Sequence, residues 1–193
     1  WRPDGRVLAS ASWDHTARLW DVSSPRSPKP LATLKGHTDA VLTISFSPDG
    51  RLLATGSADR TGRLWDVADP AAARPDAVLS GHTDEILSVA FSPDGHTLAT
   101  GGYDRTARLW NITDPANARP SAVLPELPDR VYSVQFAPGS STLTAAVADG
   151  TIRTWETDPD RAAERICATV TPKITEAEWN AGLPGLDYTP PCP

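Results

Sequence analysis

The 193-residue sequence contains no methionine and only two cysteines, Cys167 and Cys192. Two thiols are too few for a disulfide framework, and they do not form a Cys-x-x-Cys pair, so a reducing cytosol is the expected environment. The sequence also lacks an apolar run of membrane-spanning length and a signal-peptide pattern at its start. We therefore predict a cytoplasmic protein, and the pairing of the two cysteines stays open.

Positive charge is scarce relative to negative charge. The sequence has 18 Lys and Arg against 24 Asp and Glu, a net charge of −6, whereas a nucleic-acid-binding domain needs a basic stripe. No His, Cys and Asp residues cluster with metal-ligand spacing, and no glycine-rich loop has the lysine and following helix of a nucleotide site. We expect no nucleic acid, no membrane, no metal and no cofactor.

A repeat of 45 residues organises most of the chain. The same step separates four tryptophans, Trp20, Trp65, Trp110 and Trp155, and four aspartates, Asp14, Asp59, Asp104 and Asp149. A Gly-His pair recurs in the same register at 36–37 and 81–82. A fixed period of this length predicts a repeat architecture in which each unit packs on its neighbours.

The sequence predicts four short strands in each complete repeat, whereas residues 1–34 lack the first strand and residues 125–157 have no evident fourth strand. Residues 41–47 and 86–92 alternate apolar and small polar side chains, as half-buried strands do. Ser-Pro-Asp-Gly follows at 47–50 and 92–95, a type I turn sequence, before second strands at 51–57 and 96–102. Third strands are predicted at 61–67 and 106–112, and short fourth strands at 31–34, 76–79 and 121–124. The fold class is therefore all-β.

Four strands with Gly-His and Trp-Asp at fixed offsets resemble the blade of a WD40 propeller, from residue 1 to about 157. The resemblance implies about 3.5 blades of a seven-bladed propeller. We assign a partial blade to 1–34, blades to 35–79 and 80–124, a degenerate blade to 125–157 and a helical tail to 158–193. We expect the chain to be a piece of a longer product, and either upstream blades or a second copy must close the propeller.

The resemblance also assigns a structural hydrogen-bonded tetrad to each blade. Its members are His37, Ser57, Asp59 and Trp65; His82, Asp104 and Trp110; and Ser12, Asp14 and Trp20. We expect the Ser57 hydroxyl to link the Trp65 indole to His37, with Asp59 on the second ring nitrogen. In the last blade Leu127 and Val147 replace the His and Ser, so packing should hold that blade.

Ser, His and Asp in one set also suggest a hydrolase triad. The set repeats, whereas a catalytic site usually occurs once. The third repeat has Gly102 in place of Ser57, and no Gly-x-Ser-x-Gly motif surrounds Ser57. We therefore predict no catalytic residues.

Two aromatic residues, Trp13 and Tyr103, stand just before the turn aspartate. In WD40 proteins this position faces the top surface, where partners dock, and exposed aromatics make good anchors. Acidic loop residues are expected to share that face and to favour a basic partner segment: Asp39, Asp84, Glu85 and Asp129. The alternatives are aromatic packing on a neighbouring loop and simple solvation of the charges.

The repeat ends near Asp158. Helices are predicted at 158–170, with Asp158 as the N-cap and Pro159 as the first helical residue, and at 174–185. The tail resembles the ends of actinobacterial WD40 proteins fused to STAND-type NTPase or kinase domains, through Arg-Ile-Cys at 165–167, Thr-x-x-Glu-Trp at 175–179 and Pro-Pro-Cys at 190–192. This implies a non-catalytic protein-binding scaffold or sensor of a larger bacterial signalling protein. A self-assembling half-propeller and a propeller enzyme with a site at the channel mouth are the alternatives.

Overall fold

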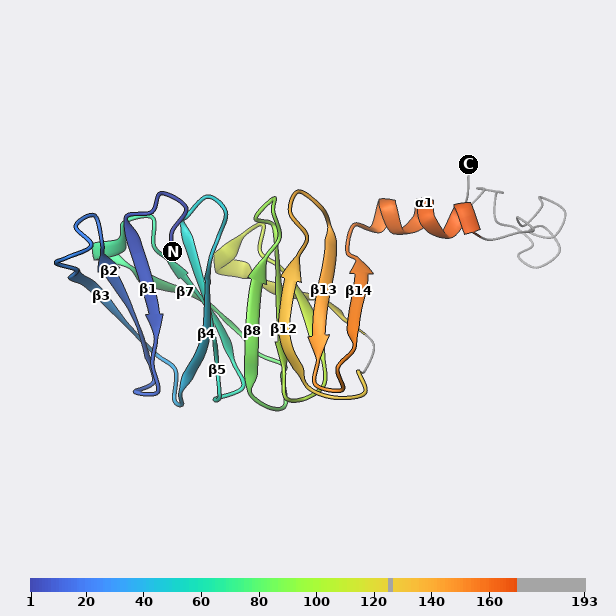
Figure 1. Ribbon diagram of the computed structural model, residues 1–193, viewed down its shortest axis with the longest axis horizontal. Helices are drawn as coiled ribbons and strands as arrows, with labels where there is room; N and C mark the ends of the chain where they lie inside the picture. The colour runs from blue at the N-terminus through green and yellow to red at the C-terminus, as the bar shows by residue number, and fades with distance from the viewer. Residues whose placement is uncertain (125–126, 170–193) are drawn as a thin grey trace, which may run out of the picture. The chain divides into compact units, whose positions relative to one another are not determined.

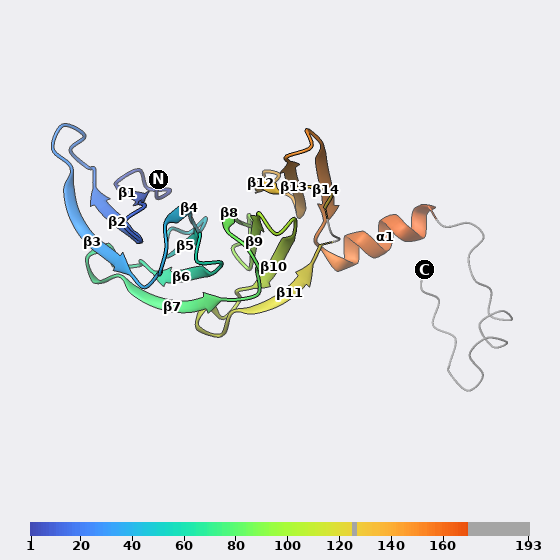
Figure 2. The same ribbon diagram turned by 90° about the horizontal axis from the view of Figure 1, so that it is seen from below.

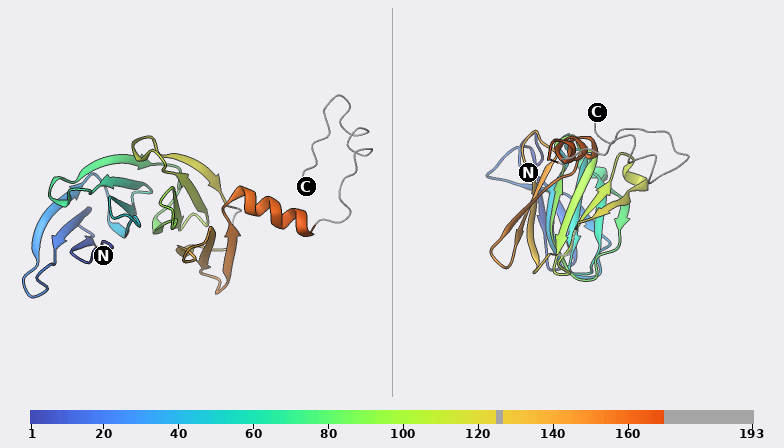
Figure 3. Two further views of the ribbon diagram at one scale, coloured as in Figure 1. Left: turned by 90° about the horizontal axis from the view of Figure 1, so that it is seen from above. Right: turned by 90° about the vertical axis from the view of Figure 1, so that its right-hand side faces the viewer.

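The computed structural model describes residues 1–124 and 127–169. Within Trp1–Trp155, one of two compact units, four antiparallel sheets stand side by side (Figure 1). Seen along the strands, the sheets follow one another around an arc, with β4, β8 and β12 on its concave side and β3, β7 and β11 on its convex side (Figure 2; Figure 3, left). This is the arrangement that the repeat predicts.

The two middle sheets have four strands and the outer two have three. The first comprises β1 (Val7–Ala11), β2 (Thr16–Asp21) and β3 (Lys29–Lys35). The second comprises β4 (Val41–Phe46), β5 (Leu52–Ser57), β6 (Gly62–Asp66) and β7 (Arg74–Leu79). The third comprises β8 (Ile86–Phe91), β9 (Thr97–Gly102), β10 (Ala107–Asn111) and β11 (Arg119–Val123), and the fourth comprises β12 (Val131–Phe136), β13 (Thr142–Val147) and β14 (Ile152–Glu156). Two 3-10 turns, η1 (Pro70–Ala72) and η2 (Pro115–Asn117), lie before β7 and β11.

The outermost strands are longer than the sequence predicts. The fourth strand of the second repeat, expected at 76–79, begins at Arg74 and includes Pro75. Pro75 lies opposite Trp65, where the register between β6 and β7 shifts. Proline lacks an N–H for the ladder and is tolerated on an edge strand at a bulge. The strand continues through the proline for this reason, and the same pairing recurs at Trp20 with Pro30 and Trp110 with Pro120.

The core lies between successive sheets. One cluster combines small and branched residues of the second sheet, among them Ala54 and Leu64, with Phe91, Leu98 and Trp110 of the third. Equivalent clusters lie between the first and second sheets and between the third and fourth sheets. The two middle sheets are packed on both faces and the first and fourth sheets on one, because a single short sheet cannot enclose a core.

Gly101 lies where the third sheet closely approaches the fourth. A Cβ atom there would lie 2.6 Å from Val131 Cγ1 and 2.9 Å from Val134 Cγ1. We expect Gly101→Ala to reduce the free energy of unfolding by about 1–3 kcal/mol, since overpacking forces the sheets apart. Urea denaturation would measure this change. Val131→Ala should lower the free energy of unfolding less in the Gly101→Ala variant than in the wild type. Strictly additive effects would contradict a contact between these residues.

In the second unit, α1 spans Pro159–Thr169. Asp158 Oδ1 accepts a hydrogen bond from the Asp160 N–H at 2.9 Å, so the helix begins at the N-cap that the sequence predicts. The helix predicted at 174–185 and Cys192 lie outside the described residues. No described helix is long and apolar enough to cross a membrane.

Candidate functional site

The turns that carry the repeated aspartates lie at the same end of each sheet as the loops that precede β4, β8 and β12. The antiparallel pairing of β4 with β5 places Val41 opposite Ser57. A backbone hydrogen bond then joins turn to loop: Ala58 N–H donates to Ala40 O, Tyr103 N–H to Glu85 O and Ala148 N–H to Arg130 O, each at 2.9 Å. We call the surface formed by turns 12–16, 58–61, 103–106 and 148–151 and loops 36–40, 82–85 and 127–130 the turn face.

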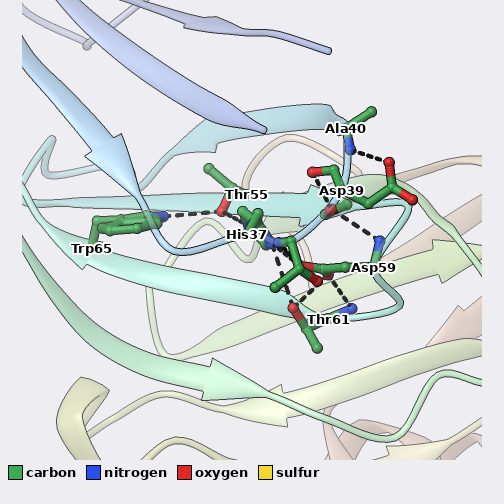
Figure 4. Close-up of polar contacts among 9 residues, drawn as sticks. His37, Asp39, Ala40, Thr55, Asp59, Thr61 and Trp65 are labelled. Carbon is green, nitrogen blue, oxygen red and sulfur yellow. Dashed lines mark hydrogen bonds and ion pairs between the residues drawn. The ribbon is translucent and has the colours of Figure 1, made fainter. Parts of the chain in front are cut away.

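A buried hydrogen-bonded chain lies directly beneath the turn face in the second sheet (Figure 4). His37 Nδ1 lies 2.8 Å from Asp59 Oδ2, and His37 Nε2 lies 2.8 Å from Thr55 Oγ1. The Trp65 indole N–H donates to Thr55 Oγ1 at 3.0 Å. A neutral imidazole protonated on Nδ1 satisfies every group, because Thr55 can accept from the indole and donate to Nε2.

The third sheet repeats this chain with its own residues. His82 Nδ1 lies 2.8 Å from Asp104 Oδ2, and Nε2 lies 2.7 Å from Thr100 Oγ1. The Trp110 indole donates to Thr100 Oγ1 at 3.0 Å. Such a network stiffens the turn and loop that it joins, since each buried polar group has a partner.

The predicted role of Ser57 is wrong: Thr55 provides the hydroxyl between Trp65 and His37. Trp65 pairs with Leu53 across β5 and β6, so Thr55, two residues further on the same side, is its diagonal neighbour. Ser57 is another two residues away, at about 3.3 Å per residue along a strand, beyond the reach of the indole. Its hydroxyl instead donates to Asp39 O and accepts from Asp59 N–H, both at 3.1 Å.

The same shift of two residues applies in the other sheets. The Trp20 indole donates to Ser10 Oγ at 2.9 Å, whereas Ser12, the predicted member, accepts from the Asp14 N–H. The third sheet therefore loses no hydroxyl at Gly102, because Thr100 supplies the hydroxyl between Trp110 and His82. A 45-residue column of Ser10, Thr55, Thr100 and Ala145 in the sequence was the signal that could have identified it. In the fourth sheet Ala145 supplies no hydroxyl, and Leu127 is buried at the histidine position.

The turn aspartates are held as carboxylates. Burial by itself raises the pKa of Asp59, but hydrogen bonds from Thr61, the Thr38 N–H and His37 outweigh it and lower the pKa to about 2. The pKa of Asp104 is lowered further by its bonds to His82, Thr106 and Thr83 against the same cost of burial. Burial lowers the pKa of His37 despite the opposing attraction of Asp59. The chain is thus built for an ionised aspartate and a neutral histidine.

Each turn closes through a left-handed residue. His15, Arg60 and Arg105 have φ of 68°, 71° and 60°. Non-glycine residues adopt this conformation at a cost of roughly 1–2 kcal/mol. In the second sheet, Asp59 Oδ1 offsets it by accepting from the Thr61 N–H at 2.9 Å and the Thr61 hydroxyl at 2.6 Å. The turns are therefore well-defined supports for the side chains on them.

The aromatic residues predicted to bind a partner differ in exposure. Trp13 is 83% exposed. Tyr103 is partly covered, because the Arg130 guanidinium lies over its ring, 4.6 Å from the centroid. For Tyr103 the alternative of packing on a neighbouring loop is what the structure shows, and only Trp13 is open.

The predicted acidic residues lie on the turn face. Asp39 and Asp84 are exposed, and Glu85 and Asp129 are partly buried. The face also carries exposed basic side chains at Arg60, Arg105 and Arg130, which sequence reasoning missed because they stand in other columns of the repeat. The turn face is mixed in charge rather than acidic.

Within residues 1–124 and 127–169, no three His, Cys, Asp or Glu side chains gather as metal ligands would. Ser57 and His37 do not form a nucleophile and base pair either: among the described hydrogen bonds, the Ser57 hydroxyl bonds to backbone groups and not to His37. What the face offers is a rigid, patterned surface with one exposed indole.

Comparison with known proteins shows which proteins this chain resembles. The family model "WD domain, G-beta repeat" matches residues 1–21, 28–66, 73–111 and 120–156, more than half of the chain. The chain is also 46% identical over 48 residues to the ribosome biogenesis protein WDR12 homolog of Nematostella vectensis. That match covers 24% of this chain and 11% of the relative, so the similarity spans about a tenth of the relative's length.

Proposed function

The chain belongs to the WD40 repeat family, and on that premise we propose that it is a non-catalytic scaffold or sensor that binds a protein partner through its turn face. WD40 repeats generally serve as protein-interaction scaffolds. We propose further that it works in the cytoplasm as the C-terminal WD40 part of a larger bacterial signalling protein. The motifs of the tail and the excess of arginine over lysine support that setting.

One observation carries the proposal: Trp13 is 83% exposed on a turn that is held from both sides. Asp14 Oδ1 accepts from the Thr16 N–H at 3.1 Å and from the Thr16 hydroxyl at 2.6 Å. Ser12 O accepts from the Val41 N–H of the next sheet at 3.1 Å. An indole presented on a rigid support loses little entropy on binding, and tryptophan is enriched among residues that dominate interface energies.

We expect Trp13→Ala with Tyr103→Ala to leave the fold intact and to reduce partner capture at least about ten-fold, the effect of losing one dominant aromatic contact. Quantitative pull-down against lysate, with thermal unfolding as the check on folding, measures both. Val78→Ala with Val123→Ala is the matched control, since these exposed apolar residues lie on the outer strands β7 and β11. Unaltered capture by the aromatic variant would show that the turn face is not the binding surface.

The open sheet edges support self-assembly as a second candidate. The first and fourth sheets have three strands each, so β1 and β14 end the hydrogen-bonded order of their sheets. Such edges invite pairing with another chain. Light scattering on the 193-residue chain distinguishes the two: a stable dimer independent of any partner favours a structural half-propeller, and a monomer favours closure by further blades.

A further inference from the structure

Three side chains come together where the third and fourth sheets meet on the turn face. The Arg130 guanidinium lies over the Tyr103 ring at 4.6 Å from its centroid. Arg130 Nε also lies 3.9 Å from Asp129 Oδ1. Tyr103 comes from the β9–β10 turn, whereas the other two come from the loop before β12. An aromatic ring and a carboxylate thus both lie next to one cation.

The repeat places the same ring and carboxylate where the first and second sheets meet, without the cation. Two steps of 45 residues lead from Tyr103 to Trp13, from Asp129 to Asp39 and from Arg130 to Ala40. The junction of the second and third sheets differs, because Ala58 stands there in place of an aromatic residue. Among the junctions between the described sheets, only the first combines an aromatic residue with a non-cationic residue at the position of Arg130.

The loops before β4 and β12 have the same backbone hydrogen bonds. Asp39 Oδ1 accepts from the Ala40 N–H at 2.7 Å, as Asp129 Oδ1 does from the Arg130 N–H at 2.8 Å. Ala40 O accepts from the following turn as Arg130 O does, both at 2.9 Å. Figure 4 shows Asp39 and Ala40 on the loop above the buried chain. Relative to its own sheet, residue 40 is therefore held by the same backbone hydrogen bonds as Arg130.

The side chains of Trp13 and Asp39 at the first junction are accessible to a ligand. Trp13 is 83% exposed, and tryptophan attracts a cation more strongly than tyrosine does. The neighbouring Asp14 is already paired with Arg18 at 2.5 Å. Asp39, in contrast, makes no ion pair with any side chain among the described residues. Its carboxylate is exposed, and its only hydrogen bond there through a side-chain oxygen is to the Ala40 N–H.

From this juxtaposition we propose that Trp13 and Asp39 receive the guanidinium group of an arginine from a partner protein, in the place that Arg130 occupies on Tyr103. The proposal rests on the proposed function of the turn face and names the chemistry that the partner must bring. Arginine fits because its planar guanidinium stacks on an aromatic ring while its edge bonds a carboxylate.

Binding of an arginine analogue to the full chain tests this. We would titrate N-acetyl-arginine N-methylamide into ¹⁵N-labelled protein and follow the indole N–H resonances, with the Trp13 resonance assigned by its loss in Trp13→Phe. We expect that resonance to move with saturable, millimolar affinity and the Trp65 and Trp110 resonances to stay. The citrulline analogue, which has the same shape without the charge, should cause no shift. Equal shifts with both ligands, or none with arginine, would overturn the proposal.

Two substitutions sharpen the test. Asp39→Asn should weaken binding of the arginine analogue about two- to five-fold, the range for one partly exposed charge pair. Ala40→Arg should supply the cation from within the chain. It should therefore shift the Trp13 resonance as saturating ligand does and weaken binding of the added arginine analogue at least about ten-fold. Ala40→Gln is the uncharged control of similar length. The proposed cation position is wrong if Ala40→Arg binds the arginine analogue as the wild type does, or if Ala40→Gln weakens that binding as much as Ala40→Arg does. If Ala40→Arg does not fold, the results with Asp39→Asn and with the citrulline analogue decide whether the proposal holds.

Partner capture separates this proposal from the proposed function. If capture needs Trp13 but is unaffected by Ala40→Arg, the turn face binds its partner without an arginine in this place, and the present proposal fails alone. If Ala40→Arg removes capture as fully as Trp13→Ala does, both stand. If the arginine analogue binds as expected and capture does not depend on Trp13, the arginine site is present and the turn face is not the partner surface.

Discussion

Replacing Thr55 with valine should lower the free energy of unfolding by about 3 kcal/mol. Valine matches the shape of threonine but has no hydroxyl, so the Trp65 indole N–H and His37 Nε2 both lose their partner at a buried site. A buried polar group without a partner costs about 1–3 kcal/mol, and two are left here. Chemical denaturation followed by the fluorescence of the buried tryptophans measures the change.

Two further variants test the assignment of the hydroxyl. Ser57→Ala should cost only about 1 kcal/mol, because its hydroxyl serves backbone groups next to the turn. Trp65→Phe, which removes the indole donor but keeps an aromatic ring, should cost about 1–3 kcal/mol for the same reason. If Ser57→Ala destabilises the protein more than Thr55→Val does, the chain described beneath the turn face is wrong.

Stability should fall with pH in two steps. The pKa of His37 is lowered from 6.5 by burial, so the neutral side chain stabilises the fold fully above pH 6.5, and this contribution declines as the pH falls below that value. The pKa of Asp59 is lowered from 3.8 to about 2, so its contribution is present above pH 3.8 and is lost as the pH falls towards 2. At 1.36 kcal/mol per unit, Asp59 contributes roughly 2 kcal/mol, and Asp104 adds to the same step.

Urea denaturation at a series of pH values between 7 and 3 would measure this dependence. Asp59→Asn is the matched variant, since it keeps the shape of the side chain and cannot titrate. It should be less stable at pH 7 and should lose less stability between pH 4 and pH 3 than the wild type does. A variant whose pH profile runs parallel to that of the wild type would show that Asp59 is not an ionised support of the turn.

The 45-residue period was enough to predict the four strands, and their order, in each of the two complete repeats. The alternation of 86–92 predicts β8 because a sheet packed between two others needs apolar side chains on alternate positions. The Ser-Pro-Asp-Gly turns follow from local chemistry: the Gly50 N–H donates to Ser47 O at 2.9 Å as a type I turn requires. Asp158 likewise predicts the start of α1 from capping alone. These features depend on interactions between residues that are close together in the sequence, so the sequence alone predicts them.

The identity of the tetrad hydroxyl depended on strand pairing. Ser57 and Thr55 both precede Asp59 and both carry a hydroxyl, and composition does not rank them. The register that sets Leu53 opposite Trp65 brings Thr55 to the indole and leaves Ser57 at the turn. The bounds of β7 depended on pairing in the same way, because a bulge opposite Trp65 accommodates Pro75 within the strand.

The sequence by itself determined the repeat, the strands and the residues that carry the turns, because these are set by local periodicity and turn chemistry. Only the tertiary structure decided which of two similar aromatic residues is open. Trp13 and Tyr103 occupy the same column, and the difference comes from residue 130 of the adjacent sheet, whose guanidinium covers Tyr103. Ala40 stands at the matching place beside Trp13 and has no side chain long enough to cover it. Contacts between sheets join residues far apart in the chain, so the exposure of a side chain is a property of the packed arrangement.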